Sequence, residues 1–367
     1  MKTALIASSA FISLFLMAVV SWGQVTVSAS DSSPSASRRV LIQDRNAPLT
    51  QTIEETRRAA EAGDLLGENN LAFAYTFGKG VEINYEEAAR WYSMAASRGY
   101  APSQFNLGVL YEDGLGVPQQ DAKAYELLHA SALQGYAPAE ERLAYFYEKG
   151  KAVPVNLAEA ARWYQAAALQ GDAVAQCTLG SFYHNGRGVP HDDAESAKWY
   201  RIAADLGNAV AQNNLGSFYH HGIGLDHDYE QALYWYRKAA AQGLAEADNN
   251  LGVMYQEGLG VDKDYRQAAA FYAEAAKHGV VRGQYNLATM YYVGRGVPLD
   301  YVTAYLWYSR AASAGDSSAA RVLKQLSGVM TPRQKELAQA RLAEGQSASV
   351  SNDPADSLFD SAKMNRK

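Results

Sequence analysis

The stretch AVAQNNLGSFYHHGIGLDHDYEQALYWYRKAAAQGL, from Ala209 to Leu244, is one copy of a unit that recurs along the chain. One glycine returns every 36 residues, at Gly78, Gly114, Gly150, Gly186, Gly222, Gly258 and Gly294. A second glycine keeps the same interval, at Gly99, Gly135, Gly171, Gly207, Gly243, Gly279 and Gly315. No insertion disturbs this register between Leu65 and Asp316, so seven repeats of equal length follow one another.

Each repeat carries the pattern of two helices. The first is exemplified by Pro102 to Glu112, where proline suits the first turn of a helix. The second shows the stripe of an amphipathic helix, with small and aromatic residues at Ala88, Trp91, Tyr92, Ala95 and Ala96. Five of the six tryptophans share one position in this stripe: Trp91, Trp163, Trp199, Trp235 and Trp307. Burying an aromatic side chain removes roughly 150–250 Å² from water, so these residues are predicted to form the core.

Capping residues mark where the second helices begin. Asparagine or aspartate stands before the stripe at Asn84, Asn156, Asp192, Asp228, Asp264 and Asp300. Glutamate or glutamine follows three residues later in five of these repeats, which predicts a capping box. Repeat two has Gln120 and Lys123 instead and should have a weaker cap. The glycine after each second helix suits a left-handed backbone, and Ala152 replaces a loop glycine in repeat three, where φ > 0 would cost ~1 kcal/mol.

A single helix pair cannot bury its own apolar stripe, so the pairs must stack. The predicted fold is all-α: a right-handed α-solenoid of antiparallel helix pairs with capping helices at both ends. The predicted boundaries are a signal peptide over 1–23, a disordered linker over 24–46, an N-terminal capping half-repeat over 47–64, the seven repeats over 65–316, C-terminal capping helices over 317–344 and a disordered tail over 345–367.

The N-terminus and the composition indicate the compartment. Lys2, the apolar run from Ala4 to Val20 and the small residues of Ser21-Trp22-Gly23 are typical of a cleaved export signal; an uncleaved membrane anchor is the alternative. We therefore expect a periplasmic or secreted protein with no membrane span once the signal is removed. A net charge of -6 without a basic run argues against nucleic acid as a partner. Cys177 is the only cysteine, so no intrachain disulfide can form.

The LGxxY, GxGV, WY and AA elements of Ala209–Leu244 resemble the Sel-one-like repeat, a relative of the tetratricopeptide repeat. The resemblance covers Leu65 to Asp316 and is weakest in repeat two, where Leu127-Leu128 replaces Trp-Tyr. It implies an adaptor or scaffold, and exported bacterial relatives include regulators of envelope signalling and exopolysaccharide production and factors in host interaction. A structural component of an envelope assembly is the alternative.

The sequence also offers few candidates for a catalytic or metal site. One cysteine-rich branch of the family binds or hydrolyses β-lactams, but its paired cysteines are missing here, and no S-x-x-K or G-x-S-x-G motif occurs. We expect no catalytic residue and no cofactor. Two pairs of histidines occupy equivalent loop positions: His184 with His220, and His191 with His227. They could bind zinc or copper or form a solvated, pH-sensitive patch; the spacing of neighbouring repeats, about 10 Å, favours the patch, and no metal site is predicted.

By analogy with tetratricopeptide arrays, the first helices should line the concave face. Asparagine recurs there at Asn70, Asn106, Asn214, Asn250 and Asn286, and it can pair with a peptide backbone or bond a neighbouring helix within the framework. Positions that vary between repeats are candidate contacts, several of them aromatic. The predicted binding residues for a peptide or protein partner are Phe105, Asn106, Val109, Tyr145, Asn214, Asn250, Tyr285 and Asn286. The sequence identifies neither that partner nor an oligomeric state.

Overall fold

The computed structural model describes residues 52–343, which form seventeen helices and no strand. The predicted signal peptide (1–23), linker (24–46) and tail (345–367) lie outside the described residues. So do residues 47–51 of the N-terminal half-repeat and residue 344 of the C-terminal cap. No helix among residues 52–343 is both long enough and apolar enough to cross a membrane.

Seven helix pairs follow one another along the chain. Their bounds are α3 (Leu65–Phe77) and α4 (Tyr85–Ser97), α5 (Ala101–Asp113) and α6 (Asp121–Ala132), α7 (Ala137–Lys149) and α8 (Leu157–Leu169), α9 (Ala173–Asn185) and α10 (Asp193–Asp205), α11 (Ala209–His221) and α12 (Tyr229–Ala241), α13 (Ala245–Glu257) and α14 (Tyr265–Lys277), α15 (Val281–Val293) and α16 (Tyr301–Ser313). Helix α2 (Ile53–Glu61) precedes the pairs, and α17 (Ser317–Val329) and α18 (Pro332–Ala343) follow them. The predicted all-α solenoid is confirmed.

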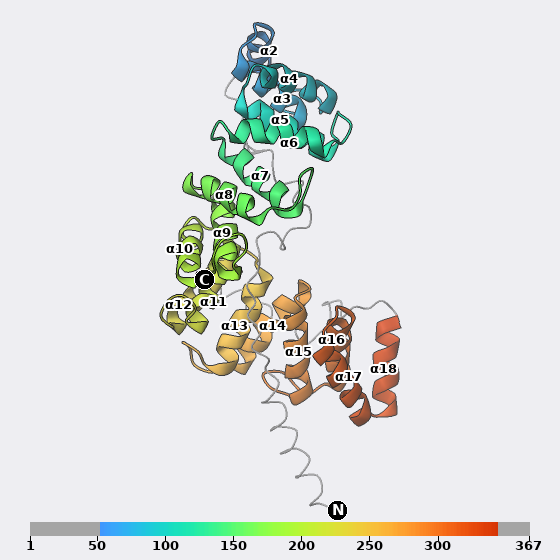
Figure 1. Ribbon diagram of the computed structural model, residues 1–367. Coiled ribbons are helices and arrows are strands. Elements are labelled where there is room, and N and C mark those ends of the chain that lie inside the picture. Colours follow the sequence, from blue (N-terminus) through green and yellow to red (C-terminus); the bar gives the residue numbers. More distant parts are fainter. Residues whose placement is uncertain (1–51, 344–367) are drawn as a thin grey trace, which may run out of the picture.

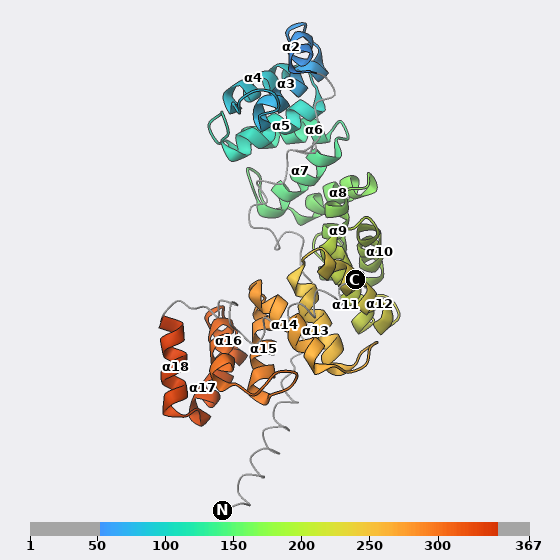
Figure 2. The ribbon, with the colours of Figure 1, turned by 180° about the vertical axis from the view of Figure 1, so that it is seen from behind.

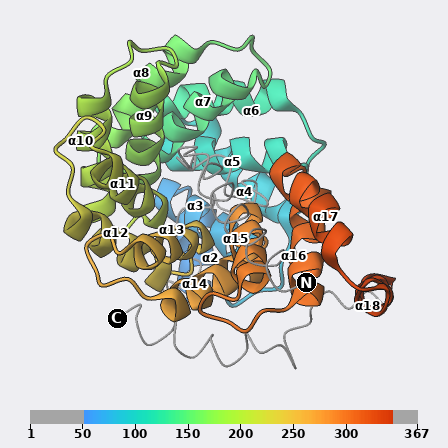
Figure 3. The ribbon, with the colours of Figure 1, turned by 90° about the horizontal axis from the view of Figure 1, so that it is seen from below.

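The pairs stack into a curved, elongated superhelix (Figures 1 and 2). A view turned by 90° shows the helices arranged around an open ring (Figure 3). In the central repeats, α8, α10 and α12 lie on the outside of this ring, and α9, α11 and α13 lie nearer its axis. The first helices therefore form the inner layer of the solenoid and the second helices the outer layer.

The caps of the second helices differ from the prediction in one respect. Six cap residues accept a hydrogen bond from a backbone N–H two or three residues on, as predicted: Asn84, Asn156, Asp192, Asp228, Asp264 and Asp300. Gln120 makes no side-chain cap, so the weaker start of α6 is confirmed. The reciprocal bond of the capping box does not form at these six helices within the described residues, and that part of the prediction was wrong. Complete boxes form at Thr52 and at Thr331.

A backbone bond explains the missing half of the box. The N–H of Asp228 donates to the carbonyl of Tyr219 in the preceding first helix, at 3.0 Å, and all seven repeats make the equivalent bond over nine residues. Because this N–H is already satisfied, the glutamate at the third position is free to pair elsewhere. In three repeats it forms an ion pair with a cation three residues on, as Glu87 does with Arg90 at 2.9 Å. This bond between the two helices of a repeat thus uses main-chain atoms alone.

The turns confirm the conformations predicted for glycine. The seven glycines after the second helices have φ between 76° and 96°. Ala152 has φ 59° and is the one non-glycine residue with positive φ among residues 52–343. It keeps the loop conformation of the other repeats, so the predicted strain is present rather than relieved by a different loop.

The aromatic stripe forms the core as predicted. The five repeated tryptophans are at most 8% exposed, and the adjacent tyrosines are fully buried. Small residues on the first helices make room for these rings: a Cβ at Gly216 would lie 2.8 Å from Cδ1 of Tyr236. Leu128 takes the place of the tyrosine in repeat two, and there a Cβ at Gly108 would lie 3.1 Å from Cγ of Leu128. Close approach between the two helices of a pair therefore explains the glycine in the LGxxY element.

Candidate protein-binding surface

Asparagine side chains connect the first helices of consecutive repeats. Nδ2 of Asn250 donates to Oδ1 of Asn213 at 2.9 Å, and Nδ2 of Asn286 donates to Oδ1 of Asn249 at 2.9 Å. The same bond joins Asn106 to Asn69 at 3.4 Å. Each donor lies 37 residues after its acceptor, so the bond crosses from one repeat to the next. This supports the framework interpretation of the recurring asparagine, although each bond uses only part of the amide.

The asparagine connection is interrupted in the middle of the array, where the acceptor position holds Phe105, Glu141 and Cys177 in turn. Buried ion pairs take its place. The carboxylate of Glu112, 3% exposed, accepts from Nε of Arg142 at 2.8 Å and from Nζ of Lys151 at 2.7 Å. Removing either partner from such a pair leaves a buried charge uncompensated. These contacts join α5 to α7 and to the loop that follows α7.

The next repeat makes a related set of contacts. Glu148 lies at the position equivalent to Glu112 and accepts from the hydroxyl of Tyr164 at 2.8 Å. Arg187, equivalent to Lys151, lies 3.2 Å from Glu148. An acid and a base therefore recur 39 residues apart in these two repeats. The sequence contains this signal, but it is hard to see because the other repeats have different residues at the acidic position.

Four of the predicted binding residues are buried. Phe105 is 0% exposed, Val109 1% and Asn214 0%, while Asn106 is 7% exposed and bonded to Asn69. The expectation that these side chains are exposed in a groove was wrong. In the middle of the array the first helices are enclosed by their own second helix and by the neighbouring repeats. Variation at positions 105 and 109 therefore reflects packing between repeats rather than freedom from it.

The other four predicted residues keep access to solvent. Asn250, Tyr285 and Asn286 are half-buried and lie on α13 and α15, near the C-terminal end of the array. The ring of Tyr285 packs edge-on against Tyr308 with centroids 5.4 Å apart, and burial raises the pKa of its hydroxyl. Oδ1 of Asn250 and of Asn286 accept no hydrogen bond from any of residues 52–343. This cluster thus offers two amide acceptors and one fixed aromatic ring.

Tyr145, on α7, lies in a different environment, four repeats before Tyr285. Its ring is half-buried, with Cζ of Arg142 5.2 Å and Nζ of Lys149 5.9 Å from its centroid. Glu141 stands on the same helix and makes no hydrogen bond or ion pair with residues 52–343. Burial, together with the charges of Asp172, Glu112 and Glu148, raises the pKa of Glu141 to about 7 despite the opposing charge of Arg142. The predicted contacts thus fall into two separate groups along the array.

The predicted histidines form two local clusters, with His184 and His220 in the last turns of α9 and α11 rather than in the loops, where His191 and His227 lie. Nδ1 of His184 lies 2.6 Å from Oδ1 of Asp193, and Nε2 of His191 lies 3.4 Å from Oδ2 of the same aspartate. His220 stacks on His221 with ring centroids 4.4 Å apart. Burial and the neighbouring histidines lower the pKa of His220 to about 4. Among residues 52–343, no group of three or more His, Cys, Asp or Glu side chains is arranged to hold a metal ion.

Cys177 is buried on α9 and forms no disulfide. Burial raises the pKa of its thiol to about 12, so the reactive thiolate is disfavoured. The side chain behaves as a small apolar residue of the core.

Comparisons with known proteins agree with this architecture. The Sel1 repeat model matches seven consecutive segments: 66–100, 101–136, 137–172, 173–208, 209–244, 245–280 and 281–316. The fold is similar to that of a protective antigen of uropathogenic Escherichia coli with an SLR fold, at TM-score 0.70 and 28% identity over 86% of this chain and 71% of that one. It is also similar to a Sel1 repeat protein from Oxalobacter formigenes, at TM-score 0.60 and 33% identity over 75% of this chain and 79% of that one. The curated proteins include no match.

Sel1 repeat proteins generally mediate interactions between proteins and are generally non-catalytic. The repeats matched by the family model occupy well over half of the sequence, and the helix pairs follow the same register. The chain therefore belongs to the Sel1 repeat family.

Proposed function

We propose that this protein is an exported scaffold that binds an extended segment of a protein partner on its inner face, in the periplasm or outside the cell. The observation that carries the proposal is the cluster of Asn250, Tyr285 and Asn286. Two amide acceptors beside a fixed aromatic ring suit a peptide backbone and an apolar side chain, respectively. Export is supported by the apolar N-terminal run after Lys2.

Among the roles open to such a scaffold are the regulation of envelope signalling, exopolysaccharide production and host interaction. All three require a specific partner, so capture of that partner is the informative experiment. A photo-crosslinking amino acid at position 285 in the full-length protein should yield a discrete crosslinked species in native cells. The matched control is position 299, since Leu299 is 57% exposed and lies on the loop between α15 and α16.

Substitutions then test whether the cluster itself binds. Asn250→Ala together with Asn286→Ala should reduce capture through position 285, because both amide acceptors are removed. Equal capture from positions 285 and 299, or capture unaffected by the two alanines, would reject the inner face as the binding surface. Fractionation of the same cells tests export: recovery in the cytoplasm, with the N-terminal segment uncleaved, would reject the proposed compartment.

A further inference from the structure

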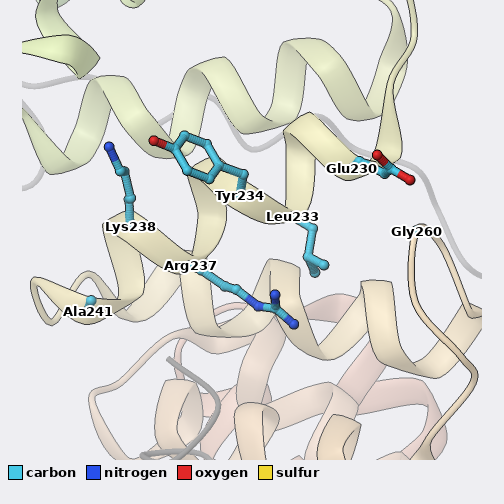
Figure 4. Close-up of a pocket in the computed structure, with 7 residues that line it drawn as sticks. All are labelled: Glu230, Leu233, Tyr234, Arg237, Lys238, Ala241 and Gly260. Atoms are coloured by element: carbon cyan, nitrogen blue, oxygen red, sulfur yellow. The ribbon is translucent and has the colours of Figure 1, made fainter. Parts of the chain in front are cut away.

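A pocket of about 460 Å³ opens on the outer surface of the solenoid, on the opposite layer from the inner face. It runs along α12 and is lined by Glu230, Leu233, Tyr234, Arg237, Lys238, Ala241 and, from the loop after α13, Gly260 (Figure 4). In Figure 4 the side chains of Tyr234 and Lys238 project from one side of α12, and those of Leu233 and Arg237 from the other. Glu230 lies at the end of the pocket near Gly260.

A change of aromatic residue explains the space beside Arg237. One repeat earlier, the guanidinium of Arg201 bonds the hydroxyl of Tyr219 and lies over the ring of Trp235, 5.2 Å from its centroid. Arg237 makes the equivalent bond to the hydroxyl of Tyr255 at 2.8 Å. The tryptophan position that follows holds Phe271, whose smaller ring stacks on Tyr255 with centroids 5.4 Å apart. The guanidinium of Arg237 is thus held in place by the hydroxyl of Tyr255, but no tryptophan ring packs over it.

The polar groups of Arg237 are incompletely satisfied. Its Nε is shielded from solvent and has no hydrogen-bond acceptor among residues 52–343. A bound acceptor that reached the guanidinium would satisfy hydrogen-bonding capacity that the protein leaves unused. Because Arg237 lines the pocket, an acceptor arriving there could use the guanidinium.

The second cation of the pocket also lacks an acidic partner. Neither Lys238 nor Arg237 has a carboxylate within ion-pair distance among residues 52–343, unlike Lys198 on α10, which lies 2.7 Å from Glu195. Lys238 corresponds to Ile202 of the preceding repeat, and Trp235 stands three residues before it, where Lys198 has Glu195. The ammonium of Lys238 lies 4.7 Å from the ring centroid of Tyr234, and this tyrosine is 47% exposed. An exposed aromatic ring beside one unpaired cation, with a second unpaired cation on the other side of the helix, suits a ligand that carries negative charge, and Glu230 is the one carboxylate that lines the pocket.

We propose that this outer pocket binds an acidic segment of a protein partner. Arg237 and Lys238 leave α12 on different sides, so one carboxylate would not reach both, whereas an extended segment with two or more Asp or Glu residues would. Tyr234 packs against the apolar part of that segment. The protein as a whole is acidic, but its long-range repulsion is screened within about 8 Å at physiological salt, so the local cations decide recognition.

Acetylated hexaglutamate amide is a defined probe for this site, measured by isothermal titration calorimetry with the full-length protein at low salt. We expect saturable binding that weakens when salt is raised, and no binding of the matched hexaglutamine peptide. Lys238→Gln should weaken binding about tenfold, equivalent to about 1.4 kcal/mol. Tyr234→Ala should weaken it by a similar factor. Both side chains are exposed at the surface, so these variants should fold normally, as far-UV circular dichroism can verify.

Lys198→Gln is the matched control, because Lys198 is also an exposed cation of an outer helix but is already paired. It should leave hexaglutamate binding unchanged. The proposal is overturned by the absence of saturable binding, by equal binding in Lys238→Gln, or by an equal loss in Lys198→Gln, which would indicate general charge attraction. Saturable binding of inorganic phosphate that competes fully with the peptide would also overturn it in favour of a small-anion site. Capture at position 285 should be unchanged in the same variants, and its loss would overturn the proposal of a separate outer site.

Discussion

Ala152→Gly should stabilise the protein, because Ala152 has a left-handed backbone at a position where the other six repeats have glycine. A non-glycine residue pays about 1–2 kcal/mol in this conformation. Glycine also makes the unfolded chain more flexible, which offsets about 0.5–1 kcal/mol of this gain. The side chain of Ala152 is exposed, so no packing is lost. The expected net gain is therefore about 0.5–1 kcal/mol in the free energy of unfolding.

Equilibrium urea unfolding, followed by circular dichroism, measures this difference. We expect the same m value for both proteins. The matched control is the reverse substitution one repeat later, Gly188→Ala. A Cβ at Gly188 would lie 2.1 Å from the carbonyl oxygen of Leu157, so backbone strain and a steric clash both act. We expect a loss of at least about 2 kcal/mol there. An unchanged or lowered stability in Ala152→Gly would refute the assignment of strain to this loop.

Three further predictions concern buried charge. Arg142→Leu leaves the carboxylate of Glu112 buried with Lys151 alone, and urea unfolding should show a loss of about 3–5 kcal/mol. Because the pKa of His220 is lowered from its ordinary 6.5 to about 4, its contribution to stability is full above pH 6.5 and is lost as the pH falls towards 4. His220→Gln should flatten this loss of up to about 3 kcal/mol in thermal unfolding across that range. Glu141 acts in the opposite sense: with its pKa raised to about 7, it favours the folded state below pH 4.5 and loses that contribution as the pH rises through 7. Glu141→Gln should therefore raise the melting temperature at pH 8 relative to the native protein, with a smaller or reversed effect at pH 4.

Each of these three predictions has an outcome that contradicts it. A stable Arg142→Leu variant would mean that Lys151 alone compensates Glu112. A native acid-induced loss of stability that persists in His220→Gln would assign it to other groups. An unaltered melting temperature of Glu141→Gln at pH 8 would show that solvent reaches the carboxylate freely.

The sequence predicted the framework because each framework residue answers to a requirement inside one repeat. Tyr236 packs against Gly216 of its own helix pair, and Asp228 caps its own helix, so both recur at a fixed interval. The failures involve two repeats at once. Glu112 is satisfied by Lys151, 39 residues on, and neither residue is conspicuous alone. Phe105 is buried because adjacent repeats enclose it, and the degree of enclosure depends on the curvature of the stack.

The outer pocket was missed for a related reason. Tyr234, Arg237 and Lys238 are ordinary residues for the exposed side of an amphipathic helix. Their significance arises from two features of the neighbouring sequence: phenylalanine replaces the repeated tryptophan at position 271, and no acidic residue stands three residues before Lys238. A search for recurring residues finds what the repeats share and misses a residue that one repeat lacks. The structure, in contrast, shows the space that results.

The main-chain bond between the cap residue of each second helix and the tyrosine carbonyl nine residues earlier has a consequence for the growth of the array. This bond lies wholly within one repeat and uses no side chain. Recombination that duplicates or deletes one 36-residue repeat would therefore leave the bond intact in every remaining repeat. Only the contacts between repeats would have to adjust at the new junction. The number of repeats can therefore change during evolution while each repeat keeps its own fold. Junctions that are bridged by asparagine, near both ends of the array, should tolerate such exchange better than the central junctions that are bridged by Glu112 and Glu148.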